Sequence, residues 1–145
     1  MTFTAKEDYG LRAMLDIAAN GARGPVQARE IALRQHIPEQ FLEQLLAGLR
    51  RAEVIRSIRG AGGGYALAVS AELLTIGAIF RALTGPLMPT DLVSPLEIDS
   101  AEAVVIRSVW SEIRESMRSV VDSTTLAALL HRRNQSGEVF HAMHI

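Results

Sequence analysis

The stretch EQFLEQLLAGLRRAEVIRSIRGAGGGY, residues 39–65, decides the fold of this chain. In its first half, leucine and phenylalanine recur at three- and four-residue spacings, which predicts an amphipathic helix with one buried stripe. The opposite face carries polar side chains, namely Gln40, Glu43, Gln44 and Arg51. A short β-prone run follows at 54–58, then Arg59 and a glycine-dense turn, then a second run at 65–69. A polar-faced helix followed by a basic-tipped hairpin is the layout of a winged helix-turn-helix, whose helix enters a major groove.

Two helices are predicted upstream of this stretch. The first covers about residues 4–20, and the second begins at about Gln27 and ends near Gln35. The bridge at 36–38 is short enough to set the second and third helices at a steep angle, as a helix-turn-helix requires. Pro38 is predicted just inside the third helix, where a missing N–H costs nothing. We interpret His36 as an ordinary polar surface residue, with a ligand role as the alternative.

Composition limits the protein class. A content of 48% hydrophobic and 21% charged residues is typical of a globular protein. The chain has no cysteine, which excludes disulfides, cysteine-ligated zinc and cysteine-held iron–sulfur clusters. No apolar run approaches the ~20 residues that span a bilayer, and the N-terminus lacks a signal-peptide pattern. We therefore expect a soluble cytoplasmic protein without membrane contact.

The charge is unevenly distributed along the chain. Residues 1–69 hold nine Lys/Arg and seven Asp/Glu, for a net charge of +2, whereas residues 70–145 hold six and nine, for −3. Arginines are concentrated at 50–59, beside the polar helix face. Local positive charge beside base-reading groups favours duplex binding whatever the global sum. A solvated charged face remains the alternative for Arg50 and Arg56.

The second half of the chain predicts an oligomerisation element. A fourth helix starts at Thr75 and stops at Gly85-Pro86, and residues 88–99 form a loop or a linker. Ser100 caps the longest helix, which extends to about Asp122. Its apolar residues recur at alternating spacings of three and four, which favours a dimer seam over packing within one monomer. The seam residues are Ile106, Trp110, Ile113, Met117 and Val120.

After the long helix we expect a short return helix ending by residue 131 and a loosely ordered tail at 132–145. The predicted fold class is therefore mainly α with a small β-hairpin wing. A winged helix-turn-helix head occupies residues 1–87, an effector or sensor loop 88–99, and the dimerisation and return helices 100–131.

No pattern in the sequence supports an enzyme or a metal site. The glycines at 60–64 do not fit G-x-G-x-x-G, and a strand-like run follows them, so we interpret them as a tight turn. Asp8 and Arg12 stand one helical turn apart and predict an ion pair before anything catalytic. The histidines at 131, 141 and 144 lack a further ligand at fixed spacing and indicate a metal tract only weakly. We predict no catalytic residue, no metal and no cofactor.

Three segments carry a resemblance to a known family: TAKEDYGLRAMLDIA at 4–18, IPEQFLEQLLAGLRRAEVIRSIRGAGGGYALA at 37–68 and LTIGAIFRALTGPL at 74–87. Within them, YGLRAML and RGAGGGY are the specific parts. The chain resembles, to about residue 130, the IscR/NsrR/CymR family of bacterial winged-helix regulators, the Rrf2 family. The resemblance implies a homodimeric transcription regulator that binds a pseudo-palindromic promoter site. It also implies that the start of the recognition helix meets base edges and that the wing arginine, here Arg59, enters the minor groove. Whether the protein represses or activates is left open.

The implied contacts agree with side-chain chemistry. Glutamine pairs with adenine, glutamate accepts from cytosine N4, and arginine is drawn to a narrow A·T minor groove. The predicted DNA-binding set is Gln27, Gln40, Phe41, Glu43, Gln44, Arg51, Arg59, Gly60, Gly62 and Gly63.

The chain departs from the family in its sensor loop. Family members that sense iron, nitric oxide or redox state carry three cysteines there, whereas this chain has LMPTDLVSPLEID at 87–99, with Leu92 about where the first would stand. In some members an acidic residue of the first helix is a further ligand; Asp8 or Glu7 matches that region, and we expect Asp8 to make a structural contact. We therefore predict a regulator without a cysteine-ligated cluster, controlled by a small molecule, a partner protein or abundance. The alternative is a winged-helix interaction module that has lost specific DNA binding.

Overall fold

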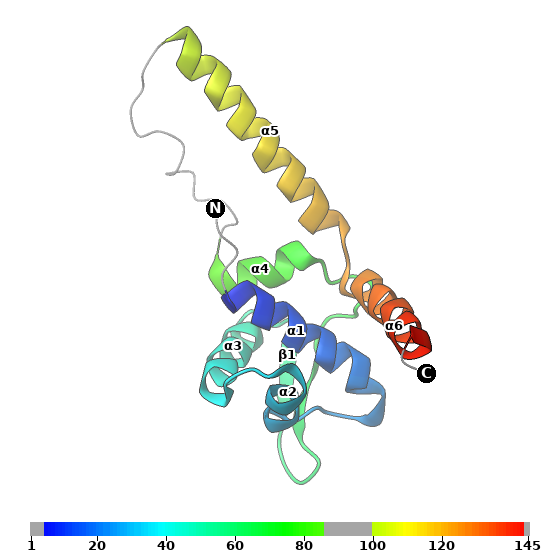
Figure 1. The fold of residues 1–145 in the computed structure, drawn as a ribbon. Helices are drawn as coiled ribbons and strands as arrows, with labels where there is room; N and C mark the ends of the chain where they lie inside the picture. Colours follow the sequence, from blue (N-terminus) through cyan, green and yellow to red (C-terminus); the bar gives the residue numbers. More distant parts are fainter. Residues whose placement is uncertain (1–4, 86–99, 144–145) are drawn as a thin grey trace.

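The computed structural model describes residues 5–85 and 100–143 (Figure 1). In chain order the elements are α1 (Ala5–Asn20), a 3-10 turn (Gly21–Arg23), α2 (Ala28–Gln35), α3 (Glu39–Arg51), β1 (Ile55–Ile58), β2 (Gly64–Leu67), α4 (Ile76–Thr84), α5 (Ala101–Ser123) and α6 (Leu126–Met143). The predicted fold class, mainly helical with one small hairpin and a long helix toward the C-terminus, is confirmed. The sensor loop at 88–99, with Leu92, lies outside the described residues.

The core forms where α1, α2, α3 and α4 meet. The predicted stripe of α3 is confirmed, because its four leucines are all buried. Full burial of a leucine side chain stabilises a fold by about 1.5–3 kcal/mol, so this stripe holds α3 firmly against the head. The largest fully buried side chains are those of Met14, Ile17, Ile31, Leu42, Leu46, Leu49, Ile55, Ile79 and Leu126.

The wing is an antiparallel hairpin, with Ile55 opposite Leu67 and Ile58 opposite Gly64. The start of β2, next to the turn, is fixed to the segment before α2, because the Val26 N–H donates to the Tyr65 carbonyl at 2.9 Å and the Tyr65 N–H donates to the Val26 carbonyl at 2.8 Å. Gly64 has φ +153°, and a Cβ there would lie 2.6 Å from the Val26 carbonyl carbon. Only glycine allows so close an approach of the two backbones.

The long helix α5 extends away from the head, on the side opposite the wing tip (Figure 1). Ser100 caps it, as predicted, since its hydroxyl accepts from the Ala103 N–H at 3.0 Å. Thr75 caps α4 in the same way, accepting from the Ala78 N–H at 3.1 Å. After α5 the chain turns back, and α6 packs beside α1.

Two local predictions were wrong. Pro38 is the N-cap of α3 and does not lie inside the helix. The return helix is not short, because α6 continues to Met143 across the segment predicted as a loose tail. That segment has no proline, and its one glycine, Gly137, has no neighbour within 4 Å, so a largely polar helix is tolerated there.

Within the described ranges, no helix is both long enough and apolar enough to cross a bilayer.

Candidate nucleic-acid interface

The outer face of α3 presents the predicted base-reading residues together. Gln40, Glu43 and Gln44 stand at i, i+3 and i+4 and are all exposed. Phe41 differs from them, because it is half-buried and its ring meets the Tyr9 ring edge-on, with centroids 5.5 Å apart at 76°. The aromatic pair ties the start of α3 to α1, so Phe41 orients the helix and its neighbours are free to reach outward.

The turn between α2 and α3 depends on a left-handed residue. His36 has φ +53° and ψ +46°, and its backbone N–H caps α2 by donating to the Ala32 carbonyl. Ile37 follows and is 4% exposed, so the turn is anchored in the core immediately before α3 starts. His36 itself is exposed. Its place at the C-cap gives it a backbone role that the sequence reading did not foresee.

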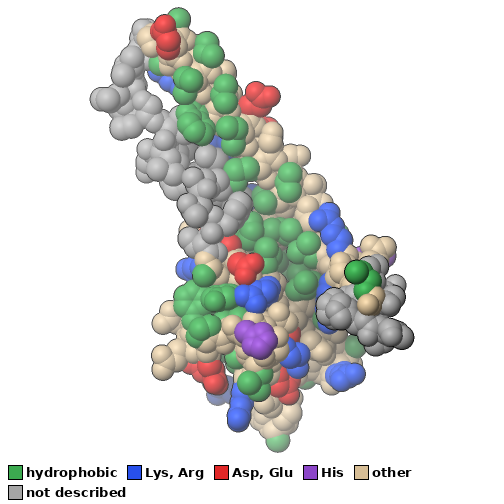
Figure 2. Space-filling model, in the orientation of Figure 1, with side chains coloured by type: hydrophobic (Ala, Val, Ile, Leu, Met, Phe, Trp, Pro, Cys, Tyr) green, Lys and Arg blue, Asp and Glu red, His purple; other side chains and the backbone are tan. Residues whose placement is uncertain are grey.

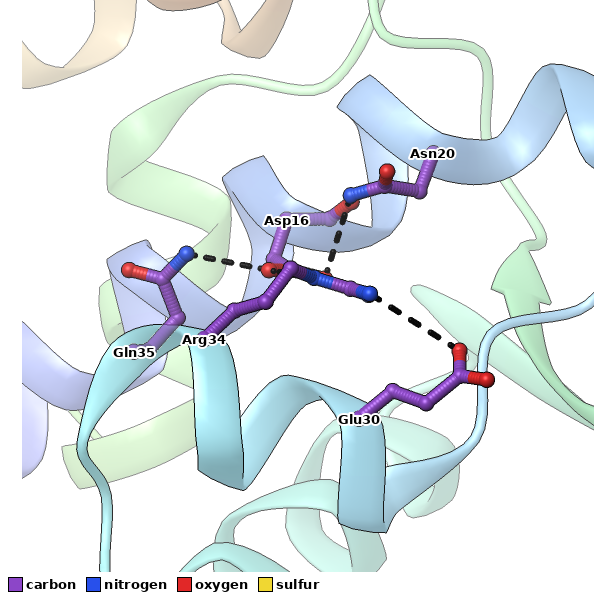
Figure 3. Close-up of polar contacts among 5 residues, drawn as sticks. All are labelled: Asp16, Asn20, Glu30, Arg34 and Gln35. Carbon is purple, nitrogen blue, oxygen red and sulfur yellow. Dashed lines mark hydrogen bonds and ion pairs between the residues drawn. The ribbon is translucent and has the colours of Figure 1, made fainter.

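Sequence reasoning also missed a polar cluster around the buried Asp16, between α1 and α2 (Figure 3). The Asp16 side chain is 1% exposed and accepts two hydrogen bonds from the Arg34 guanidinium, at 2.9 and 2.8 Å. It also accepts from the Gln35 amide at 2.9 Å and from Asn20 at 3.4 Å, while Glu30 approaches Arg34 at 3.9 Å. This cluster fixes the last turn of α2, directly before the helix-turn-helix bridge. The only signal in the sequence was a lone acid within the apolar run MLDIA at 14–18.

Opposing effects act on the Asp16 carboxyl. Burial alone raises its pKa, but the hydrogen bonds from Arg34 and Gln35, together with the Arg34 charge, lower the pKa below the ordinary 3.8. The carboxyl therefore stays ionised near neutral pH and keeps its partners.

A second contact holds the same end of α2. The Arg12 guanidinium donates to the Gln35 carbonyl at 2.6 Å and to the Asp8 carboxylate at 3.0 Å, and it lies 4.9 Å from the centroid of the Tyr9 ring. The predicted i, i+4 pair of Asp8 and Arg12 is confirmed. Arg12 thus joins the end of α2 to the aromatic pair at the start of α3.

The wing tip is exposed and built from glycine. Gly60 has φ +103° and Gly62 φ +81°, which favour glycine, and the Gly63 N–H closes the turn on the Gly60 carbonyl at 2.9 Å. A Cβ at Gly63 would run into the Ile58 carbonyl oxygen. These contacts fit the predicted turn and leave Arg59 exposed at the tip.

The two remaining predicted residues lie on either side of this region. Gln27 is exposed at the N-cap of α2, next to the Val26–Tyr65 pair that holds the wing. Arg51 lines a hollow of about 440 Å³ together with Gln44 and Lys6. Gln27 therefore lies at the wing side of the surface, and Arg51 at the far end of α3.

The predicted seam of α5 lies bare in the single chain. Figure 2 shows hydrophobic side chains running along this helix. Ile106, Trp110, Ile113 and Val120 are 42–63% exposed, and Met117 is half-buried. Val104, Val105 and Val109 widen the apolar surface and are also exposed. Contiguous apolar surface of this kind marks an interaction site.

The comparisons with known proteins agree with this geometry. The model of a family described as "Rrf2: Iron-dependent Transcriptional regulator" matches residues 3–132. The chain belongs to the Rrf2 family. The HTH-type transcriptional regulator CymR of Bacillus subtilis is 39% identical over 129 residues, which cover 89% of each chain. The HTH-type transcriptional regulator IscR of Erwinia tasmaniensis is 31% identical over 99% of this chain and 92% of its own length.

Solved structures of Rrf2 relatives share the fold. CymR, the global cysteine regulator of B. subtilis, superposes with a TM-score of 0.77 at 37% identity, over 91% of this chain and 98% of that one. T. potens IscR superposes with a TM-score of 0.78 at 37% identity, over 94% and 90%. This Rrf2 protein is accordingly a DNA-binding transcription regulator of the winged-helix type and not an enzyme.

The donor set of this Rrf2 protein does not fit the iron in the family description. The chain has no cysteine, and the described residues contain no group of three or more histidine and acidic side chains placed to hold a metal ion. Asp8, at the position that matches an acidic ligand region, is engaged with Arg12. The described residues therefore offer no set of ligands that would hold iron.

Proposed function

We propose that this Rrf2 protein is a homodimeric regulator that binds a pseudo-palindromic promoter site. In this proposal α3 enters the major groove, and Arg59 of the wing enters the adjacent minor groove. The observation that carries the proposal is the exposed group of Gln40, Glu43 and Gln44 on a helix anchored by buried leucines. Glutamine and glutamate at these positions match adenine and cytosine edges, while an exposed arginine suits a narrow A·T minor groove.

The α5 seam supports the dimer. A second copy that covers Trp110 and its apolar neighbours would remove them from water, and burial of such surface is the main driving force for association. Two heads joined in this way would present paired recognition helices, as a site with two half-sites requires.

In this proposal, the regulator responds to a small molecule or a partner protein. It does so without a cysteine-ligated cluster. We assign the segment 88–99 to this sensing role, residues 1–87 to the head and 100–131 to dimerisation. Chromosomal DNA as the target places the protein in the cytoplasm.

DNA binding is tested with the wild-type protein and a promoter fragment of its own operon, by fluorescence anisotropy over a range of salt. We expect Arg59→Ala to weaken specific binding by about 1–3 kcal/mol, mainly at A·T positions, and to lower the salt slope by about one phosphate contact. Arg133→Ala is the matched control, because Arg133 is also an exposed arginine but lies on α6. Wild-type affinity in Arg59→Ala would remove the wing from the mechanism.

One observation favours a second candidate function, a protein-interaction module without specific DNA binding. Glu39 and Glu43 place carboxylates on the exposed face of α3, where DNA phosphates would repel them. Absence of any competitor-resistant gel shift at low salt would favour the module over the DNA-binding regulator.

A further inference from the structure

Among the described residues, α5 meets the head at its C-terminal end. Val121 is its one buried residue, Met117 is half-buried, and the large apolar residues from Val104 to Ile113 are exposed. In Figure 1 the end of α5 nearer the head lies close to α4. The described contacts that orient the head relative to α5 therefore lie near residues 121–126.

Two backbone hydrogen bonds hold this end of α5 to the segment around Thr75. The Ile76 N–H donates to the Thr124 carbonyl at 2.9 Å, and the Leu126 N–H donates to the Leu74 carbonyl at 2.8 Å. Leu126 is fully buried and is part of the main core. The chain on both sides of the α5–α6 junction is thus held to the start of α4.

A side-chain contact completes the junction. The Asp122 carboxylate accepts from the Arg81 guanidinium at 2.9 Å, which joins α5 to α4. Its other oxygen lies against Gly77, where a Cβ would collide with it and would also lie 3.2 Å from the Asp122 Cγ. Gly77 is the second residue of α4, and its lack of a side chain allows this close approach. We call Gly77, Arg81 and Asp122, with the two backbone pairs, the joint.

We propose that the joint fixes the tilt of the DNA-binding head on α5 and so selects the spacing between operator half-sites. This inference rests on the proposed dimeric function. The 23 residues of α5 make a helix about 34 Å long, so a tilt of about 6° at the joint moves its far end by about 3.5 Å. One base pair of duplex rises about 3.4 Å. With one head held on its half-site, such a tilt would move a partner copy seated on the far part of α5 by a comparable distance.

The Arg81–Asp122 ion pair and Gly77 have separate roles in the joint. The Arg81–Asp122 pair resists opening of the angle between α4 and α5, and Gly77 lets the Asp122 carboxylate rest on α4. Because the pair is partly exposed, its loss should loosen the joint without unfolding the head. The consequence is a change in spacing selectivity more than in overall affinity.

The test uses full-length protein and a duplex that the wild type has selected from a random library. Affinity is measured for this duplex and for versions with one base pair inserted or deleted between the half-sites. We expect the wild type to bind the altered duplexes at least about tenfold more weakly. Asp122→Ala should reduce that loss of affinity by about threefold or more. Without the ion pair, the head can tilt on α5 and still reach the displaced half-site.

A double-mutant cycle separates the joint from general destabilisation. Gly77→Ala should cut the spacing penalty as Asp122→Ala does, because the new methyl displaces the carboxylate. In an Asp122→Ala background the colliding carboxylate is gone, and only the flexible end of Arg81 lies near the new methyl, at 3.0 Å. Gly77→Ala should therefore have no further effect on the penalty. Gly137→Ala is the matched control, since this helical glycine has no neighbour within 4 Å, and it should keep the full penalty.

The outcomes distinguish the two proposals. If Asp122→Ala and Gly77→Ala both keep the wild-type spacing preference, the proposal that the joint selects the spacing is wrong. The proposed function is then unaffected. A wild type that selects no duplex rejects the proposed function itself. If Asp122→Ala does not fold, Asp122→Asn gives the same decision, because it keeps the shape and removes the charge that Arg81 binds.

Discussion

Replacing Asp16 with alanine tests whether the cluster between α1 and α2 holds the head together. The change removes a carboxylate that is 1% exposed and that accepts three hydrogen bonds from Arg34 and Gln35. Removing one partner of a fully buried ion pair costs about 3–5 kcal/mol. The Arg34 side chain is 40% exposed and regains water after the change, so the expected loss is smaller, about 2–3 kcal/mol.

Urea unfolding followed by circular dichroism measures this loss, at one fixed protein concentration because dimer stability depends on it. With a denaturant slope of about 2 kcal/mol/M, the midpoint should fall by about 1–1.5 M. Asp8→Ala is the matched control, because it removes an Asp–Arg pair from the same helix where the carboxylate is 68% exposed. Its expected loss is at most about 0.5 kcal/mol. Equal losses of unfolding free energy in the two variants would refute the argument that Asp16 contributes more than Asp8 because it is buried.

Three further outcomes are expected. Gly64→Ala should destabilise the protein by at least about 2 kcal/mol in urea unfolding, because its methyl meets the Val26 backbone at positive φ, whereas Gly21→Ala, with open space, should stay within about 0.5 kcal/mol. Thr75→Ala removes the hydroxyl that caps α4 and should lower the thermal midpoint by the equivalent of about 1 kcal/mol; an unchanged midpoint would exclude a stabilising cap. Because the folded pKa of Asp16 lies below 3.8, its contribution is complete above that pH and is lost as the pH falls through the folded value. The stability difference between wild type and Asp16→Ala should therefore be constant near neutrality and shrink in acid, and a difference that instead grew in acid would contradict the direction of the shift.

The sequence predicts well those features that depend on residues close together in the chain. The buried stripe of α3 follows from a 3.6-residue period, and the pair of Asp8 and Arg12 follows from one helical turn. The wing follows from β-prone runs on either side of a glycine turn whose backbone needs positive φ.

Contacts between distant segments were not predictable in the same way. Arg34 lies 18 residues after Asp16, and nothing local distinguishes it from an exposed arginine of α2. The joint brings Asp122 to Arg81 across 41 residues, and no local pattern marks Gly77 as the residue against which Asp122 lies. The predicted DNA-binding residues share one side of α3 and the wing, but their roles at particular bases stay predictions.

The core of the N-terminal head is completed by a residue from α6, which is synthesised last, and this order has a consequence for the nascent chain. Leu126, from the start of α6, is fully buried in the same cluster as residues of α1 and α3, and the Ala127 N–H donates to the Ala71 carbonyl at 3.0 Å. A nascent chain emerging from the ribosome therefore presents its recognition helix before the residue that seals the interior has been made. Prematurely terminated chains would display the reading surface without a sealed interior, so they should be cleared by proteases before they could compete for operators.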